Sequence, residues 1–199
     1  MFEIKGMKSI VVFCGSSEGV KEEYANDAFQ LGKAMADNNM QLVYGGAKIG
    51  IMGQVASGVL SNGGKAIGVI PKFLMKKEVF HPELTELIIT KDMHERKLKM
   101  HDFSDGIIML PGGYGTLEEF FEMLTWAQLG LHQYPIGVLN TDDFYDQLLN
   151  MLKHMVDQGF VKQLNYDMIL VDDTITGLLT KMENYKPVPV PKWLTKDQT

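Results

Sequence analysis

The sequence contains little cysteine, no long apolar run and no excess of positive charge. Cys14 is the single cysteine among 199 residues, so no disulfide can form within them, as is usual in a reducing compartment. No apolar run approaches the ~20 residues that a membrane-spanning helix needs. Glu3, Lys5 and Lys8 interrupt the pattern of a signal peptide. These absences predict a cytoplasmic protein without a membrane partner.

The balance of charge is acidic. Lys and Arg number 19 against 25 Asp and Glu, which gives a formal net charge of −6. An acidic chain without a basic cluster argues against nucleic acid as a partner, so any anion has to be captured by a local site. The length predicts one domain over residues 1–185, and the alternating prolines that follow predict an extended tail over residues 186–199.

Apolar segments and amphipathic segments alternate along the chain. Strands are expected at residues 9–14, 41–44, 66–70, 84–90, 106–110, 136–139 and 168–171. Helices are expected at residues 22–36, 50–60, 92–103, 115–128, 144–156 and 174–185. This alternation predicts an α/β fold, an open parallel sheet with helices on both faces.

Glycine-bearing turns follow three of the strands, at residues 15–17, 45–47 and 112–115. Ligands of an open parallel sheet bind beyond the carboxyl ends of its strands, so these turns are expected to converge on one crevice. The ligand contacts expected in the first two turns are Gly15, Ser16, Gly45 and Gly46. Ser16 and Ser17 would either bind phosphate through their hydroxyl groups or cap the next helix. No turn spells G-x-G-x-x-G or G-x-x-x-x-G-K-[ST], which argues against a dinucleotide dehydrogenase and a P-loop NTPase.

The third turn carries the most informative motif, Pro-Gly-Gly-Tyr-Gly-Thr-Leu-Glu-Glu at residues 111–119. It joins an apolar strand to an amphipathic helix, and its glycines let backbone N–H groups approach a ligand closely. The free N–H groups and the dipole of the new helix favour an anion such as phosphate. Glu118 and Glu119 then leave the first turn about 100° apart. At least one of them is expected to act on the ligand; the alternative is that both only complement the helix dipole.

The helix that follows this turn is expected to pack its apolar side on the sheet. The residues on that side are Leu117, Phe120, Phe121 and Leu124, whereas Glu118, Glu122 and Thr125 share another side. The sequence therefore predicts an apolar contact surface and a separate acidic surface on one helix.

A second polar cluster, Met-His-Glu-Arg-Lys at residues 93–97, precedes the strand that leads into the third turn. The Arg96 guanidinium can clamp a phosphate or a carboxylate with two hydrogen bonds, and Lys97 adds a point charge. The alternative is a solvated helix face. The histidines show no metal-ligand spacing, and Cys14 is interpreted as a buried structural thiol. No metal or other cofactor is expected.

Together these segments resemble the LOG family, the cytokinin riboside 5′-monophosphate phosphoribohydrolases, often labelled lysine decarboxylase-like. The resemblance covers residues 10–185 and rests on the motifs at 93–97 and 111–119. Supporting segments are residues 13–17, 43–46 and 125–130. The resemblance implies a Rossmann-like fold, a homodimer and hydrolysis of a purine nucleoside 5′-monophosphate to the free base and ribose 5-phosphate. A decarboxylase would need pyridoxal phosphate on a lysine, and nothing here pairs such a lysine with a pyridine-nitrogen partner.

The resemblance also implies roles for individual residues. Arg96 and Glu119 stand where the family has its catalytic residues. The implied nucleotide contacts are Glu78, Arg96, Lys97, Gly112, Gly113, Tyr114, Gly115, Thr116, Leu117, Glu118 and Thr125. Ala47 departs from the family, in which a third glycine often stands at this position.

Glu119 is expected to stabilise an oxocarbenium-like transition state and to position or deprotonate the attacking water. Its place near a helix N-terminus and beside Arg96 is expected to keep it ionised at neutral pH, which argues against a proton donor. A rival interpretation is a molybdenum-cofactor carrier, which has similar glycine turns but does not need the Arg96–Glu119 pair. A third is a nucleotide sensor that binds AMP without turnover. The motifs do not specify the base, because AMP, an N6-prenylated AMP or another base monophosphate would all fit the same phosphate and ribose contacts.

Overall fold

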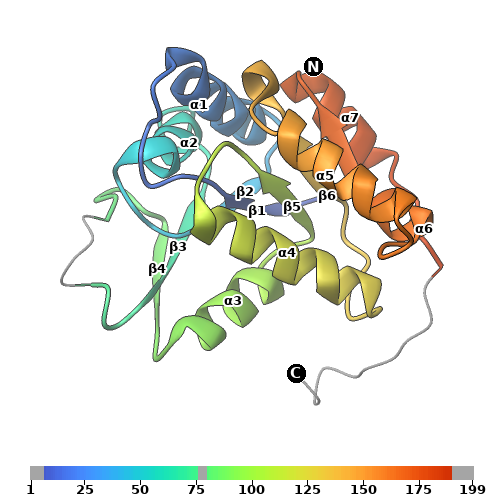
Figure 1. Cartoon of the computed structure of the whole chain (residues 1–199). Helices are drawn as coiled ribbons and strands as arrows, with labels where there is room; N and C mark the ends of the chain where they lie inside the picture. Colours follow the sequence, from blue (N-terminus) through green and yellow to red (C-terminus); the bar gives the residue numbers. More distant parts are fainter. Residues whose placement is uncertain (1–6, 76–79, 190–199) are drawn as a thin grey trace.

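A seven-stranded parallel sheet forms the centre of the molecule (Figure 1). The computed structural model describes residues 7–75 and 80–189. The strand order is β4-β3-β2-β1-β5-β6-β7. The strands are β1 (Ser9–Phe13), β2 (Gln41–Tyr44), β3 (Ala66–Pro71), β4 (Glu86–Thr90), β5 (Gly106–Met109), β6 (Ile136–Leu139) and β7 (Ile169–Asp172). The expected α/β fold with an open parallel sheet is confirmed.

Helices cover both faces of this sheet (Figure 1). They are α1 (Glu22–Asp37), α2 (Gly50–Leu60), α3 (Met93–Asp102), α4 (Tyr114–Gln128), α5 (Asp146–Asp157), α6 (Gln163–Tyr166) and α7 (Ile175–Glu183). One core lies between the sheet and α1, α2 and α7, and a second lies between the sheet and α3, α4 and α5. Strand β1 serves both cores, because Ile10 and Val12 face the first and Val11 and Phe13 face the second.

The strand order places a topological switch beside β1. From β1 the chain proceeds outward through β2, β3 and β4 on one side, and it later returns to add β5, β6 and β7 on the other. The loops that follow β1 and β5 therefore leave neighbouring strands in diverging directions. Such a switch point opens a crevice at the carboxyl ends of the strands, which is where ligands bind in this class of fold.

Most expected elements are present, with differences at their ends. The bounds of α2 match the expectation, whereas β4 begins at Glu86 and α5 begins at Asp146. A short 3₁₀ turn, η1 (Thr141–Asp143), precedes α5, and α6 was not expected. Within η1, Asp142 and Asp143 both have positive φ, a backbone conformation that sequence periodicity does not reveal.

The expected tail begins after α7, and its residues 190–199 lie outside the described part of the chain. The domain boundary at residue 185 stays a prediction. Among the helices of residues 7–75 and 80–189, none is both long enough and apolar enough to cross a bilayer.

Candidate active site

Two of the glycine turns meet at the switch point between β1 and β5. The backbone N–H of Gly15 donates a hydrogen bond to the Pro111 carbonyl at 3.0 Å. A methyl group at Gly112 would lie 2.8 Å from the Gly15 nitrogen and 2.2 Å from the Thr116 hydroxyl oxygen. Only glycine therefore allows this approach, and the predicted convergence of these two turns is confirmed.

The loop after β1 is held in place by the N-terminus of α2. The N–H groups of Ile51 and Met52 donate to the carbonyls of Ser17 and Gly15, at 3.4 and 3.2 Å. These bonds use helix N–H groups that would otherwise have no partner. The N-cap position of α1 is Lys21, not a serine, so the expectation that Ser16 or Ser17 caps this helix is wrong. Phosphate binding by their hydroxyl groups stays a prediction.

The first turn of α4 presents backbone N–H groups to a cleft. The helix begins at Tyr114, and the first N–H to reach a helical carbonyl is that of Leu117, which donates to Gly113 at 3.1 Å. Within the described chain, no side chain caps this end. The space next to Gly113 and Gly115 is open for 4 Å in the direction of a side chain. The N-terminus of α4 is therefore free to receive an anion.

Arg96 and Glu119 form a buried ion pair behind this turn. Arg96 Nη1 lies 2.6 Å from Glu119 Oε1, and the two side chains are 12% and 11% exposed. Arg96 Nε donates to the Val69 carbonyl within β3, at 3.1 Å. A methyl group at Gly45 would lie 2.9 Å from Arg96 Nη2, so the glycine after β2 leaves room for the guanidinium. Strand β3, the turn after β2 and the helices α3 and α4 thus fix the orientation of this pair.

The burial of Glu119 shifts the pKa of its carboxyl group. Burial raises the pKa of the Glu119 carboxyl above its ordinary value, and the charge and hydrogen bond of Arg96 offset only part of this rise. Desolvation therefore has a larger effect on this carboxyl than the charge of Arg96 does, and the expectation that Glu119 is ionised at neutral pH stays a prediction. Glu119 titrates at a higher pH than an exposed glutamate does.

The cleft that contains the pair has a volume of about 400 Å³. Its apolar lining includes Val12, Cys14, Met52 and Met100, and its polar lining includes Arg96, Glu119 and the start of α4. Cys14 is buried, as expected, and burial raises the pKa of its thiol; its role as a structural thiol stays a prediction. Because apolar residues line the cleft beside the ion pair, electrostatic interactions with a bound ligand are stronger there than in water.

Lys97 turns away from this cleft. Its Nζ lies 2.6 Å from Glu118 Oε1 and 3.0 Å from Glu122 Oε2, both on α4. Burial disfavours the charged ammonium, but its hydrogen bonds to the two carboxylates have the greater combined effect, and the pKa of Lys97 is raised. Lys97 is therefore a cation paired with two anions.

The other predicted site residues divide into two groups. Those that line the cleft are Gly15, Ser16, Gly45, Gly113, Tyr114, Gly115 and Thr116. Those that do not line it are Gly46, Gly112, Leu117, Glu118 and Thr125. Thr125 lies further along α4, is exposed, and donates its hydroxyl to the Phe121 carbonyl. Glu78 lies outside the described residues.

The orientation of α4 differs from the helical-wheel expectation. Its buried residues are Thr116, Glu119, Phe120, Met123 and Ala127. Leu117, Phe121 and Leu124 are only partly buried. The helix is oriented so that Glu119, which pairs with Arg96, lies on its buried side. A wheel based on apolarity alone could not place an acidic residue there.

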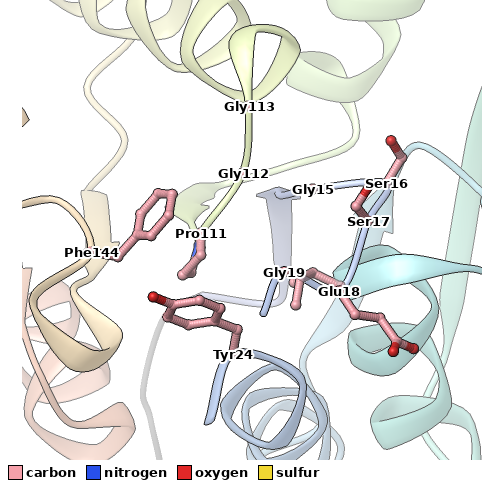
Figure 2. Close-up of a pocket in the computed structure, with 11 residues that line it drawn as sticks. Gly15, Ser16, Ser17, Glu18, Gly19, Tyr24, Pro111, Gly112, Gly113 and Phe144 are labelled. Atoms are coloured by element: carbon pink, nitrogen blue, oxygen red, sulfur yellow. The ribbon is translucent and has the colours of Figure 1, made fainter. Parts of the chain in front are cut away.

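A second hollow, of about 280 Å³, lies on the other side of the Gly112–Gly113 turn. Figure 2 shows the rings of Tyr24 and Phe144 on one side of it and Ser16 and Ser17 on the other. The two rings pack edge to face with centroids 5.5 Å apart. We call this space the aromatic pocket. No sequence motif predicts this pocket, because Tyr24 lies on α1 and Phe144 lies between η1 and α5.

The chain is similar to known proteins over most of its length. A family model described as possible lysine decarboxylase matches residues 52–182. Cytokinin riboside 5′-monophosphate phosphoribohydrolase LOG3 of Arabidopsis thaliana is 44% identical over 192 residues, which cover 93% of this chain and 89% of that protein. The corresponding enzyme LOG of Oryza sativa subsp. japonica is 45% identical over 180 residues, with coverage of 90% and 74%.

Solved structures share the fold at lower identity. A molybdenum cofactor binding protein from Rippkaea orientalis has a TM-score of 0.66 and 22% identity, covering 88% of this chain and 95% of that one. A Moco carrier protein from Chlamydomonas reinhardtii has a TM-score of 0.65 and 21% identity, with coverage of 88% and 94%. At these identities the likeness concerns the fold alone.

Proposed function

The chain belongs to the LOG family of phosphoribohydrolases, and we propose that its substrate is a purine nucleoside 5′-monophosphate, either AMP or an N6-modified AMP. It is an N-glycosidase that releases the free base and ribose 5-phosphate. The single observation that carries this proposal is the buried Arg96–Glu119 pair, 2.6 Å apart, below the open N-terminus of α4. A binding protein needs the N-terminus but not the pair.

The 5′-phosphate is held by backbone groups. The N–H groups of the first turn of α4 face the cleft, and the helix dipole adds partial positive charge at the same point. Ser16 faces the same cleft from the loop after β1. This arrangement explains how a chain with net charge −6 captures an anion without a basic patch.

The ribose then lies against the ion pair. As the glycosidic bond breaks, its electrons leave with the base and positive charge develops on the ribose ring. The Glu119 carboxylate stabilises that charge and orients the water whose oxygen bonds to C1′. Arg96, held by the Val69 carbonyl, keeps Glu119 in position. One proton of the water ends on the departing base, so free base and ribose 5-phosphate form in equal amounts.

The direct test is product analysis with purified protein. AMP, N6-isopentenyl-AMP and adenosine are incubated separately, and free base and ribose 5-phosphate are quantified. We expect equimolar products from at least one monophosphate and none from adenosine, which lacks the phosphate. Binding of both monophosphates without product would contradict the proposal and favour a carrier or a sensor.

We also propose that the protein acts as a homodimer. Leu117, Phe121 and Leu124 form a partly buried apolar strip on α4, which a second copy would cover. Light scattering after gel filtration gives the mass in solution, and a mass near 22.4 kDa would contradict this proposal.

We propose a cytoplasmic location, because the sole cysteine of the chain, Cys14, is a buried free thiol. Cell fractionation of the tagged protein tests this, and recovery outside the cytoplasmic fraction would contradict it.

A further inference from the structure

The loop after β6 places a buried tyrosine against the Gly112–Gly113 turn. Tyr145 lies between η1 and α5 and is 3% exposed. Its hydroxyl group donates a hydrogen bond to the Leu110 carbonyl at 2.7 Å, and it also accepts one from the backbone N–H of Gly112. Tyr145 therefore joins the two backbone groups on either side of Pro111, where the chain passes from β5 into α4.

These bonds complete the pairing of the backbone at the start of the turn. The Leu110 N–H donates to a carbonyl of β1 at 3.0 Å, and the Pro111 carbonyl accepts from the Gly15 N–H at 3.0 Å. Pro111 itself has no N–H. With Tyr145 in place, the backbone polar groups from the Leu110 N–H to the Gly112 N–H all have partners. The turn is therefore fixed up to the point where the free N–H groups of α4 begin.

The position of Tyr145 is itself fixed by the sheet. Its backbone N–H donates to Asn140 Oδ1 at 2.7 Å, and Asn140 Nδ2 donates to Asp146 Oδ1 at 2.8 Å. Asn140 follows β6 directly, and its backbone N–H donates to the Asp172 carbonyl on β7 at 2.8 Å. The hydroxyl group of Tyr145 is thus presented by a loop that two strands hold in place.

We propose that Tyr145 is a positioning residue for the 5′-phosphate, which fixes the turn so that the N–H groups at the start of α4 converge on the anion. Tyr145 does not line the cleft, so it acts through Leu110 and Gly112 and does not contact the nucleotide. Donors that are held in position before binding need no rearrangement when the anion arrives. This role rests on the proposed function, which places the phosphate at this helix N-terminus.

The Tyr145→Phe variant tests this role, because it keeps the ring and removes only the hydroxyl group. The Leu110 carbonyl and the Gly112 N–H then lose a buried partner, and the turn relaxes. The dissociation constant of ribose 5-phosphate, measured by calorimetry, and KM for AMP should each rise about 10-fold. The value of kcat should stay within about threefold of wild type, because binding shared by the ground state and the transition state affects KM alone. A lower Tm with both binding constants unchanged would overturn the proposal.

The matched control is Thr141→Val on the same loop. The Thr141 hydroxyl group is also buried, and it donates to Asp27 Oδ2 on α1 at 2.7 Å, away from the turn. Its loss should lower Tm but leave the affinity for ribose 5-phosphate unchanged. An equal loss of affinity in this control would contradict the proposal, because the stability of the loop, and not the hydroxyl group of Tyr145, would then determine phosphate binding.

A second variant, Asn140→Ala, decides the question if Tyr145→Phe does not fold. It removes the acceptor of the Tyr145 N–H and keeps the tyrosine side chain. Ribose 5-phosphate should bind about threefold more weakly, and unchanged affinity would contradict the proposal. The double variant Asn140→Ala/Tyr145→Phe should bind no more weakly than Tyr145→Phe alone, because both changes act on one interaction; additive losses would contradict it.

Calorimetry with ribose 5-phosphate measures binding without turnover, so it separates failure of this role from failure of the proposed function. If wild type binds ribose 5-phosphate but releases no base from any monophosphate, the proposed function is wrong. If wild type releases base and Tyr145→Phe binds ribose 5-phosphate as tightly as wild type does, only the role of Tyr145 is wrong.

Discussion

The cleft and the aromatic pocket flank the same Gly112–Gly113 turn, yet their chemistry differs. Both include Gly15, Ser16 and Gly113 in their lining. The cleft adds a buried guanidinium–carboxylate pair, whereas the described residues that line the aromatic pocket include no basic side chain. Under the proposed function, the glycine turn supplies binding, and the side chains behind it decide whether a reaction follows.

If this comparison is correct, changes on the cleft side alter turnover, and changes on the pocket side alter stability. Each experiment below tests one side.

The largest effect is expected from Glu119→Gln. The amide keeps the shape of the side chain but cannot stabilise positive charge or accept a proton from water. Turnover should fall by roughly 10²- to 10⁴-fold, while ribose 5-phosphate still binds, because the N-terminus of α4 is unchanged. Initial rates and calorimetric titration measure the two quantities. Turnover within a few-fold of wild type would remove Glu119 from the mechanism.

Arg96→Lys should have the next largest effect. A lysine cannot bond the Val69 carbonyl and the Glu119 carboxylate in the fixed geometry of a guanidinium. We expect a fall of roughly 100-fold in kcat with a small change in KM. A variant with an unchanged kcat would show that any cation beside Glu119 is sufficient.

The pH dependence tests the raised pKa of Glu119. Because the ionised carboxylate carries the activity, turnover should fall as the pH drops through this raised pKa, which is at a higher pH than for an exposed glutamate. Folding favours the protonated form of Glu119. The stability that Glu119 contributes is therefore fully present below the ordinary pKa of a glutamate, and it is lost as the pH rises through the raised pKa of the folded state. Profiles of kcat and Tm measure both trends. The Glu119→Gln variant should lack this part of the Tm profile.

Gly45→Ala tests whether the second glycine turn is needed to leave room for the Arg96 guanidinium. The added methyl group would lie 2.9 Å from Arg96 Nη2 and 2.9 Å from the Met52 sulfur, and both side chains must move. We expect a loss of about 10-fold in kcat from displacement of the guanidinium. Crystal structures of the variant would show the shift. Full activity would mean that Arg96 has more freedom than its partners suggest.

The smallest effect on turnover is expected in the aromatic pocket. Phe144→Ala removes an edge-to-face contact with Tyr24 and another with Tyr145, at 5.5 and 4.8 Å between ring centroids. Stability should fall by about 1–2 kcal/mol, while kcat for AMP stays within about twofold. The control is Phe160→Ala, at a ring that is 87% exposed, which should change neither quantity. A large loss of turnover in Phe144→Ala would give the pocket a part in the reaction.

The sheet was accessible from the sequence because it depends on local patterns, whereas the placement of Arg96 beside Glu119 was expected from the family resemblance. Apolar runs ended by glycine predict strands and turns, and parallel strands bring such turns to one edge. The pairing of Lys97 with Glu118 and Glu122 was not accessible. It depends on the orientation of α3 and α4 about their own axes. That orientation is set by the packing of each helix against the sheet and its neighbours as a whole. The aromatic pocket was missed for a different reason, since Phe144 is presented by a turn with positive φ at Asp142 and Asp143, which local patterns do not predict.

The central claim is that the Arg96–Glu119 pair makes a phosphate-binding fold into a phosphoribohydrolase. The most direct test places wild type and Glu119→Gln in the same assay with AMP and N6-isopentenyl-AMP, and measures bound nucleotide, free base and ribose 5-phosphate together. The account predicts that both proteins bind and that only wild type releases equimolar products. Bound nucleotide recovered intact from wild type would contradict it.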